Sequence, residues 1–341
     1  MSRPSTFPPI AVSLGDPAGI GPELIAEAWA RREREALAPF AVVGGARLMA
    51  AAAASRGLEL PIEPIASLAE AVEVFDRALP VLGSLDGVWR PGEHEREGAT
   101  LALASLEAAA ALAVSGEASA LVTGPIAKGL LAEVGFNHPG QTEFVAHACG
   151  VAAQDAVMML AGPQLRTIPL TVHVALARVP SLVSHDLIRR RARIAAEALR
   201  RDFGIERPRL AVAALNPHAG EDGRFGDEDQ RVVAPAIAAL QAEGIDATGP
   251  YLADALFAPH ARGDYDVALC MYHDQALIPL KALHFEEGVN LTLGLPIVRT
   301  APDHGTAFDI AGEDRADPRA MAAAIRMAAG CAAQRLSNRW L

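Results

Sequence analysis

Cysteine is scarce in this chain of 341 residues, which contains only Cys149, Cys270 and Cys331. Three thiols so far apart in the sequence form neither a disulfide framework nor a cysteine-based zinc module. The first nine residues also lack the charged and then apolar order of a secretory signal peptide. These absences favour a reducing compartment, and we expect a cytoplasmic protein.

Positive charge and long apolar runs are also in short supply. The 30 Lys and Arg residues face 41 Asp and Glu residues, which gives a formal net charge of -11. A nucleic-acid partner requires an extended basic surface that displaces counterions, and the locally basic segment 189–193 has the pattern of the solvated side of a helix. Glu107 interrupts the best candidate for a membrane span. We therefore expect neither a nucleic-acid partner nor a membrane.

Apolar residues, by contrast, make up 51% of the chain and suffice for a large core. Short β-branched runs alternate with Ala- and Leu-rich amphipathic segments, which is the pattern of parallel strands joined by helices. We therefore expect an α/β protein with two lobes or two domains. The expected strands are residues 10–14, 40–43, 120–123, 156–160, 167–173, 209–215, 267–271 and 289–293. The expected helices are residues 22–34, 99–114, 187–202, 228–241 and 319–333.

The first expected strand is followed by the segment Gly15-Asp-Pro-Ala-Gly-Ile-Gly-Pro-Glu23, which opens a helix. Backbone N–H groups at a helix start favour an anionic ligand, but the same residues also suit a tight turn from strand to helix. The spacing differs from the G-x-G-x-x-G of dinucleotide-binding folds. A dinucleotide is therefore expected to bind in another way.

Three histidines follow three expected strands: His173, His218 and His273. The carboxyl ends of parallel strands line the ligand crevice of an α/β sheet, so the three rings can converge despite their separation in sequence. Any one of them alone is more simply explained as a surface or hydrogen-bonded histidine. Three neutral imidazoles with an open position suit a catalytic zinc or a related divalent ion. We therefore predict a metal site.

Two of these histidines have informative neighbours. His218 is followed by the long polar segment 219–226, which packing alone does not explain. His273 is followed by Asp274, which could either orient the ring by a hydrogen bond or cap the next helix.

A set of longer motifs runs through nearly the whole chain. They are Ser13-Leu-Gly-Asp-Pro-Ala-Gly-Ile-Gly-Pro-Glu23, Val122-Thr-Gly-Pro-Ile126, Leu215-Asn-Pro-His-Ala-Gly220, Gly249-Pro250 with Ala253-Asp-Ala-Leu-Phe257, Met271-Tyr-His-Asp-Gln275, Gly288-Val-Asn-Leu-Thr-Leu-Gly-Leu-Pro296, Arg299-Thr300, Asp303-His-Gly-Thr-Ala307 and Ala311-Gly312. Together these motifs resemble those of the 4-hydroxythreonine-4-phosphate dehydrogenases. The resemblance implies a metal-dependent, NAD-linked oxidation of a small phosphorylated hydroxy acid in vitamin B6 synthesis.

The resemblance also implies roles for individual residues. The three histidines match the family's metal ligands, which come from both subunits of a homodimer with the active site at the interface. The implied substrate contacts are two cations and two neutral hydrogen-bonding groups, which suit a phosphate and a carboxylate. These contacts are Thr142, Lys281, Asn290 and Arg299. Without the resemblance, the two cations would more often be surface charges.

One position departs from the family's usual pattern. Many members have Gly-His-Thr-Glu where this chain has Gly140-Gln-Thr-Glu143, so Gln141 replaces a histidine that contacts the substrate phosphate. Glutamine donates an N–H to phosphate but carries no positive charge. We interpret Gln141 as a substrate-binding variant, and the alternative is that it caps the start of a helix.

The implied fold is that of isocitrate and isopropylmalate dehydrogenases, with two α/β/α lobes and an active-site cleft between them. We expect a first lobe, on the cofactor side, at residues 1–135 and 290–341. The second lobe, with the metal, substrate and dimer contacts, is expected at residues 136–289. In those enzymes a His-Gly loop holds the adenosine part of NAD, so we predict that NAD or NADP contacts Asp303, His304 and Gly305. Taken alone, the five residues 303–307 suit a turn before a helix.

The implied reaction begins at the C3 hydroxyl of 4-phosphohydroxy-L-threonine. A divalent ion such as Zn, Mg or Co would lower the pKa of this hydroxyl, and NAD would accept the hydride. Lys281 or Asp254 could take the proton, although Asp254 could instead orient a ligand. The product, 2-amino-3-oxo-4-phosphobutanoate, is a β-keto acid that decarboxylates to 3-amino-2-oxopropyl phosphate.

Two other functions stay open from the sequence. A paralogous dehydrogenase of a phosphorylated threonate or erythronate, or of a dihydrodiol, would carry nearly all these motifs, and Gln141 keeps this alternative open. A three-histidine site would also serve a metal-dependent hydrolase or a metal-regulated binding protein. Production of NADH separates the dehydrogenases from the other two.

Overall fold

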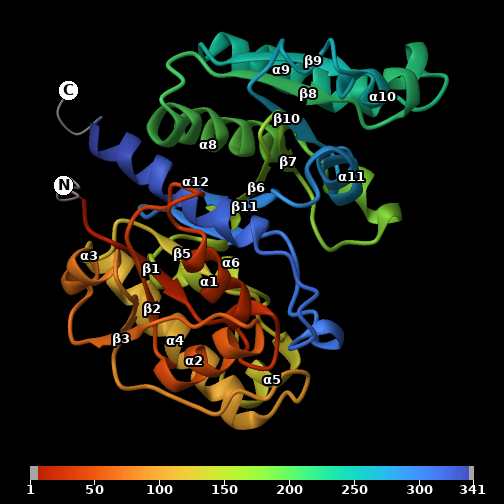
Figure 1. Cartoon of the computed structure of the whole chain (residues 1–341). Coiled ribbons are helices and arrows are strands. Elements are labelled where there is room, and N and C mark those ends of the chain that lie inside the picture. Colours follow the sequence, from red (N-terminus) through yellow and green to blue (C-terminus); the bar gives the residue numbers. More distant parts are fainter. Residues whose placement is uncertain (1–6, 338–341) are drawn as a thin grey trace. The chain divides into compact units, whose positions relative to one another are not determined.

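The computed structural model describes residues 7–337 and divides into two compact units (Figure 1). Among these residues, unit 1 combines residues 7–153 with residues 295–337, and unit 2 is the continuous segment Gln154–Gly294. The lobe boundaries predicted from the sequence, after residues 135 and 289, differ from these units by the segments 136–153 and 290–294 and remain a prediction.

Unit 1 is built on parallel strands in the order β3-β4-β2-β1-β5-β12. They are β1 (Ile10–Ser13), β2 (Phe40–Val43), β3 (Ile62–Ile65), β4 (Leu79–Leu82), β5 (Leu121–Thr123) and β12 (Arg299–Pro302). Every residue of β1, β2 and β5 is buried. Burial on both faces explains why these strands are continuous apolar runs rather than alternating ones.

The helices of unit 1 cover this sheet. They are α1 (Gly21–Ala30), α2 (Ala46–Ser55), α3 (Ala71–Val74), α4 (Arg96–Ser115), α5 (Lys128–Glu133), α6 (Gln141–Ala148) and α12 (Arg319–Ser337). α4 packs on β1, β2 and β5, and α12 packs on β1, β5 and β12. The predicted α/β fold class is confirmed.

Among the described residues, α4 is long and apolar enough to cross a membrane by length and composition alone. The expectation that Glu107 rules out any such segment was therefore wrong. Leu101, Leu106 and other residues of one side of α4 are buried, and the helix packs on three strands. A helix that packs in a core needs the same apolar composition.

A buried ion cluster joins α1 to the chain beyond α2 and to the loop before α12. The side chain of Arg56 is 6% exposed and pairs with Glu27, with Glu23 at 3.7 Å and with Asp314 at 3.2 Å. Glu23 also accepts the N–H of Gly312 at 3.1 Å. Burial raises the pKa of the Glu23 carboxyl. The cluster therefore holds residues 312–314 against α1.

Unit 2 contains the strands β11-β6-β7-β10-β8-β9 in this order. They are β6 (Val157–Ala161), β7 (Arg166–Pro169), β8 (Arg209–Ala213), β9 (Asp246–Tyr251), β10 (Val267–Cys270) and β11 (Val289–Leu293). Parallel pairing was predicted, but β6 runs antiparallel to both β7 and β11. The reason is that β6 and β7 form a hairpin in which Gly162 N–H donates to Leu165 O at 2.9 Å, and its loop is too short for a parallel crossover.

The helices of unit 2 are α7 (Val179–Leu182), α8 (His185–Phe203), α9 (Ala234–Ala242), α10 (Ala253–Leu256) and α11 (His273–His284). α11 packs on β6, β7 and β10, and α8 packs on β6, β8 and β11. The hydroxyl of Ser184 caps α8 by accepting the N–H of Leu187 at 3.2 Å, and Gly204 ends it in a left-handed conformation.

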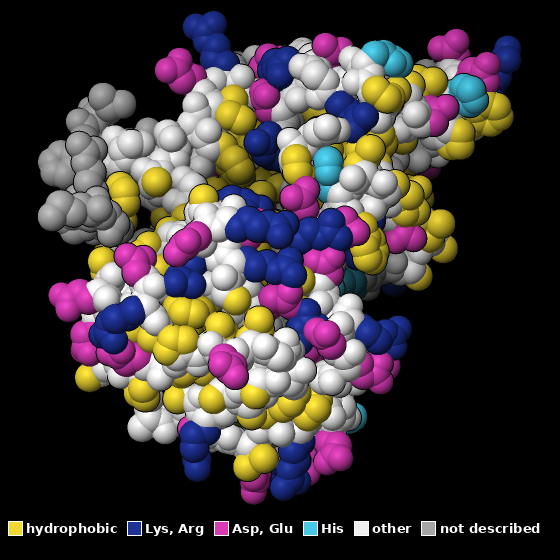
Figure 2. Space-filling view, viewed as in Figure 1, with side chains coloured by type: hydrophobic (Ala, Val, Ile, Leu, Met, Phe, Trp, Pro, Cys, Tyr) yellow, Lys and Arg dark blue, Asp and Glu magenta, His cyan; other side chains and the backbone are white. Residues whose placement is uncertain are grey.

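The basic segment 189–193 lies on α8, and much of its charge is paired within unit 2. Arg189 and Arg193 both bind Glu243 and lower the pKa of its carboxyl to about 2. Arg190 binds Asp155 at 3.3 Å. On the face drawn in Figure 2, acidic and basic side chains are interspersed, including beside the central row of basic side chains.

Candidate functional site

Three neighbouring parallel strands of unit 2 end at one edge of its sheet, each followed by one of the predicted histidines. β10 lies between β7 and β8 and runs parallel to both. His173 follows β7, His218 follows β8, and His273 begins α11 after β10. All three thus lie after carboxyl strand ends, and their role as metal ligands remains a prediction.

The histidines after β7 and β10 lie close together, with ring centroids 5.8 Å apart. The hydroxyl of Thr171 donates to the carbonyl of Met271 at 2.8 Å, which ties the two strand ends to each other. Both residues are buried. Sequence reasoning missed Thr171, for which proximity to His173 was the only available signal.

Asp274 orients the ring of His273, as one of its two predicted roles required. Its Oδ1 lies 2.7 Å from Nδ1 of His273. The capping alternative was wrong, because Tyr272 occupies the N-cap position of α11 and no side chain caps the helix. With Nδ1 engaged, Nε2 of His273 is the ring atom that suits a metal ion.

A cavity of about 310 Å³ opens beside these two rings. Thr171, His173, Leu176, His273 and Asp274 are among its lining residues. The space has the size of a small-molecule site, and neutral imidazole is a frequent ligand of zinc and related ions. The cavity therefore fits one divalent ion that takes part of its coordination from this chain.

His218 lies on a loop with an unusual backbone. Residues 218–222 all have positive φ angles, between 41° and 82°, and only one of them is a glycine. Such angles are uncommon in other residues and must be stabilised by the surroundings. Asp229 is 1% exposed and accepts the N–H of Leu215 at 2.7 Å and of Asn216 at 2.9 Å. Its carboxylate thus fixes the chain that enters this loop.

Gln275 links the chain before the His218 loop to the chain before His273. Its Oε1 accepts the N–H of Met271 at 2.6 Å, and its Nε2 donates to the carbonyl of Ala214 at 2.9 Å. Sequence reasoning assigned no role to Gln275 or to Asp229, although Gln275 lies in a quoted motif. Both act through backbone groups, which residue type and spacing do not reveal.

The three histidines do not form one cluster in the described part of the chain. Within residues 7–337, no group of three or more His, Cys, Asp or Glu side chains is arranged to hold a metal ion. The ring centroid of His218 instead lies 6.2 Å from that of Phe225. Within this chain, His218 is therefore not brought together with His173 and His273.

The other predicted residues of unit 2 lie on different elements. Nζ of Lys281, on α11, is 5.9 Å from the ring centroid of Phe285. Asp254 is exposed in α10, and its Oδ1 accepts the N–H of Ala255 at 3.0 Å. The buried Oδ1 of Asn290, on β11, has no hydrogen-bond partner among the described residues. A buried amide oxygen without a partner is costly, so this atom fits a ligand that donates a hydrogen bond.

Arg299 and Gln141 form a polar cluster in unit 1. Arg299 is 4% exposed, and its Nη2 donates to Oγ1 of Thr123 at 2.6 Å and to Oε1 of Gln141 at 2.7 Å. The hydroxyl of Thr123 also donates to Oε1 of Gln141 at 2.7 Å, and Nε2 of Gln141 donates to the carbonyl of Gly124 at 2.8 Å. The alternative that Gln141 caps a helix was wrong, because Gly140 is the N-cap residue of α6 and no side chain caps that helix.

This cluster carries a buried positive charge at the start of α6. Burial lowers the pKa of Arg299 to about 10, and the charge of Glu143 opposes this shift. Arg299 therefore stays charged at neutral pH. Thr142 is half-buried in the first turn of α6. A guanidinium and a helix N-terminus both favour an anionic ligand.

The loop after β1 contacts the loop after β12. Residues 14–20 are all buried. The N–H of Ile20 donates to the carbonyl of Thr306 at 2.9 Å, and the N–H of Asp16 donates to that of Pro125 at 2.8 Å. These N–H groups are used within the chain, which favours a tight turn over an anion site at the start of α1.

The predicted cofactor residues lie on the β12 side of this contact. Asp303 and His304 are half-buried, Gly305 is exposed, and Nδ1 of His304 lies 3.0 Å from the carbonyl of Gly305. A Cβ on Gly19 would come within 2.7 Å of the carbonyl of Thr306, so the close approach of the two loops requires glycine there. Contact between these residues and NAD remains a prediction.

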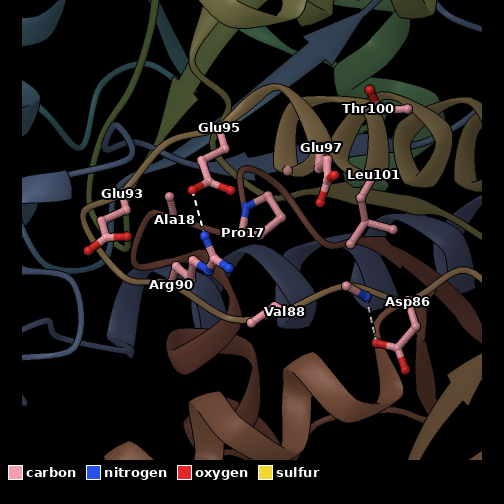
Figure 3. Close-up of a pocket in the computed structure, with 12 residues that line it drawn as sticks. Pro17, Ala18, Asp86, Val88, Arg90, Glu93, Glu95, Glu97, Thr100 and Leu101 are labelled. Carbon is pink, nitrogen blue, oxygen red and sulfur yellow. Dashed lines mark hydrogen bonds and ion pairs between the residues drawn. The ribbon is translucent and has the colours of Figure 1, made fainter.

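A second cavity, of about 350 Å³, lies in unit 1 beside Pro17 and Ala18 (Figure 3). Carboxylates of Glu93 and two further glutamates line it, and Arg90 pairs with Glu95 at 2.7 Å. No predicted site residue is part of its lining. The excess of negative charge disfavours a phosphate ligand there.

The chain is similar to known proteins along almost all of its length. A family model described as pyridoxal phosphate biosynthetic protein PdxA matches residues 36–328. The 4-hydroxythreonine-4-phosphate dehydrogenase of Erythrobacter litoralis (strain HTCC2594) is 64% identical over 327 residues, which cover 96% of this chain and 97% of that protein.

Solved structures agree with this assignment. The 4-hydroxythreonine-4-phosphate dehydrogenase from Klebsiella pneumoniae matches with a TM-score of 0.87 and 40% identity, covering 97% of this chain and 99% of that one. A terephthalate 1,2-cis-dihydrodiol dehydrogenase from Burkholderia xenovorans LB400 matches with a TM-score of 0.64 and 30% identity, covering 95% and 98%. Given the extent of these matches, the chain belongs to the family of the pyridoxal phosphate biosynthetic protein PdxA.

Proposed function

We propose that this chain catalyses the NAD-dependent oxidation of 4-phosphohydroxy-L-threonine to 2-amino-3-oxo-4-phosphobutanoate, which decarboxylates to 3-amino-2-oxopropyl phosphate. The observation that carries the proposal is 64% identity, over 96% of the chain, to a relative named 4-hydroxythreonine-4-phosphate dehydrogenase. The polar clusters after the strands of each unit support it, because the substrate has a phosphate, a carboxylate and a hydroxyl to be held.

In this proposal, His173, His218 and His273 hold one divalent ion, Zn, Mg or Co. His173 and His273 lie beside one cavity, and Asp274 orients the second ring. His218 would come from the second subunit of a homodimer. Once bound, such an ion would lower the pKa of the C3 hydroxyl.

The remaining predicted residues would bind the anionic groups of the substrate and accept the transferred proton. Arg299, held by Gln141, would bind an anionic group together with Thr142 at the start of α6. The partnerless Oδ1 of Asn290 would accept a hydrogen bond from the substrate. Lys281 or Asp254 would accept the hydroxyl proton. NAD or NADP, placed near Asp303, His304 and Gly305, would accept the hydride.

The proposal also includes the location of the enzyme and its partners. A cytoplasmic homodimer with a small phosphorylated substrate, and with neither nucleic acid nor membrane as partner, agrees with the net charge of -11 and with the paired arginines of α8. The packing of α4 on three strands agrees with the proposed lack of a membrane partner.

The comparisons do not favour the alternative functions. Identity to the dihydrodiol dehydrogenase is 30%, against 64% to the 4-hydroxythreonine-4-phosphate dehydrogenase. A hydrolase or metal-regulated binding protein has no support among the similar proteins described above.

The test is an NADH absorbance assay with 4-phosphohydroxy-L-threonine, with and without a chelator, beside a phosphorylated threonate and a dihydrodiol. We expect NADH from the first substrate and its loss with chelator. His218→Ala should abolish metal-dependent turnover and leave the circular dichroism spectrum unchanged. Turnover by this variant without metal would refute the ligand assignment, and preference for another substrate would refute the proposed reaction.

Mixing inactive variants tests whether the ligands come from two subunits. In the proposal, each site takes His173 and His273 from one subunit and His218 from the other. A mixed dimer of His218→Ala and His273→Ala then contains one intact site. Activity should then return to about a quarter of the wild-type value after random exchange of subunits. A mixture of His173→Ala and His273→Ala should stay inactive. The reverse result would contradict this division of ligands.

A further inference from the structure

Lysine is rare in this chain, since only Lys128 and Lys281 are lysines among its 30 basic residues. Arginine therefore serves nearly every position that needs only a positive charge. A lysine ammonium is a compact point charge on a flexible stem, and arginine does not replace it at every site. Lys281 is part of the proposed function, whereas Lys128 has no role in it.

Lys128 lies beside the start of α6. A Cβ built on Gly140, the N-cap residue, would be 3.4 Å from Nζ of Lys128 and 3.0 Å from Oε2 of Glu143. The side chain of Lys128 is exposed, and among the described residues it has no ion pair or hydrogen bond. Its ammonium group is thus next to the first turn of α6 and available to a ligand.

The same turn carries Gln141 and Thr142, two of the residues predicted to bind the substrate, and neither of them supplies a positive charge. Gln141 is neutral, and its amide is engaged with Arg299, Thr123 and Gly124. A phosphomonoester carries a charge of about -1.5 to -2 at pH 7. Arg299 supplies one positive charge in unit 1, and the nearby negative charge of Glu143 favours its charged form.

We propose that Lys128 binds the phosphate group of the substrate at the start of α6, and supplies there the positive charge that Gln141 lacks. This inference rests on the proposed function for the identity of the substrate. The uncapped first turn of α6 would contribute its N–H groups to the same phosphate. Gln141 then acts by holding Arg299 rather than by contributing charge.

The experiment compares Lys128→Gln and Lys128→Arg with Arg34→Gln in the full-length protein. Arg34 is a matched control because it belongs to unit 1 and its side chain is 75% exposed. In Lys128→Gln, the KM for 4-phosphohydroxy-L-threonine should rise about tenfold or more, the value of one charge-assisted hydrogen bond. The kcat and the KM for NAD should stay within about twofold. Lys128→Arg should recover most of the affinity, and Arg34→Gln should change none of these constants.

Isothermal titration with inorganic phosphate gives a readout that does not depend on turnover. Phosphate should bind Lys128→Gln about tenfold more weakly than wild type. Equal affinities, an equal loss in Arg34→Gln, or no phosphate binding by wild type would each overturn the proposal. Absence of NADH from the wild-type enzyme would overturn the proposed function instead, and the phosphate titration would still decide the role of Lys128.

Discussion

Replacement of Asp229 by Asn should loosen the His218 loop without any change to its own residues. The carboxylate is 1% exposed, and its two oxygens accept the N–H groups of Leu215 and Asn216. Asn has nearly the same shape but presents an NH2 group to one of these donors. One charge-assisted hydrogen bond is lost, and a partly buried N–H is left without its partner.

The structure sets the size of this effect. A hydrogen bond to a charged group contributes about 1.5–3 kcal/mol, and a buried donor without a partner costs about 1–3 kcal/mol. Because the two terms overlap, we expect the free energy of opening this segment to fall by about 2–4 kcal/mol. That corresponds to amide exchange at least about 30-fold faster at Leu215 and Asn216.

Hydrogen–deuterium exchange followed by mass spectrometry measures this directly. Asp227→Asn is the matched control, because Asp227 lies in the same segment, is 65% exposed and pairs only with Arg231 among the described residues. Its effect should stay below about 0.5 kcal/mol. Metal affinity should fall in Asp229→Asn and stay unchanged in Asp227→Asn. Equal exchange rates in the two variants would mean that the Asp229 carboxylate does not hold the loop.

Three further changes test other parts of the structure. Thr171→Val removes the donor to the Met271 carbonyl, so Co²⁺ binding, followed by its visible absorbance, should weaken about tenfold or more; an unchanged affinity would contradict the link between the strand ends. Arg56→Met leaves Glu23 buried without its cation, and urea denaturation should show a loss of about 3–5 kcal/mol at pH 7. Burial raises the pKa of Glu23 in the folded state, so this deficit should shrink as the pH falls from 7 towards 5; a deficit that grows would disprove the assignment. Burial also raises the pKa of Cys270, so its thiol should react with Ellman's reagent at pH 8 only after unfolding.

The strongly apolar strands could be predicted from the sequence, and four weaker ones could not. All eight expected strands occur, from β1 at Ile10–Ser13 to β11 at Val289–Leu293. The missed strands are β3, β4, β9 and β12, and each contains proline, as in Ile62–Ile65 and Arg299–Pro302. Proline normally argues against a strand because it cannot donate to the ladder. Pairing with neighbours far along the chain decided these segments, and local pattern does not contain that information.

The residues of the candidate site likewise fall into those that the sequence predicted and those that it did not. Periodicity placed His173, His218 and His273 after strand ends, which the structure confirms. The supporting residues Thr171, Asp229 and Gln275 could not be found this way, because each binds a backbone group brought near by the fold. The engagement of Gln141 with Arg299 joins residues 158 positions apart and has no local signature.

Because unit 1 is formed by two separate segments of the chain, the two units are completed at different stages of synthesis. Unit 2 is one unbroken stretch, whereas unit 1 lacks β12 and α12 until almost all of the polypeptide has been made. During synthesis, one edge of β5 therefore stays unpaired until β12 has been made, which happens only after all of unit 2. Exposed strand edges can pair with other chains, so we expect the nascent first half of this protein to be its stage most prone to aggregation.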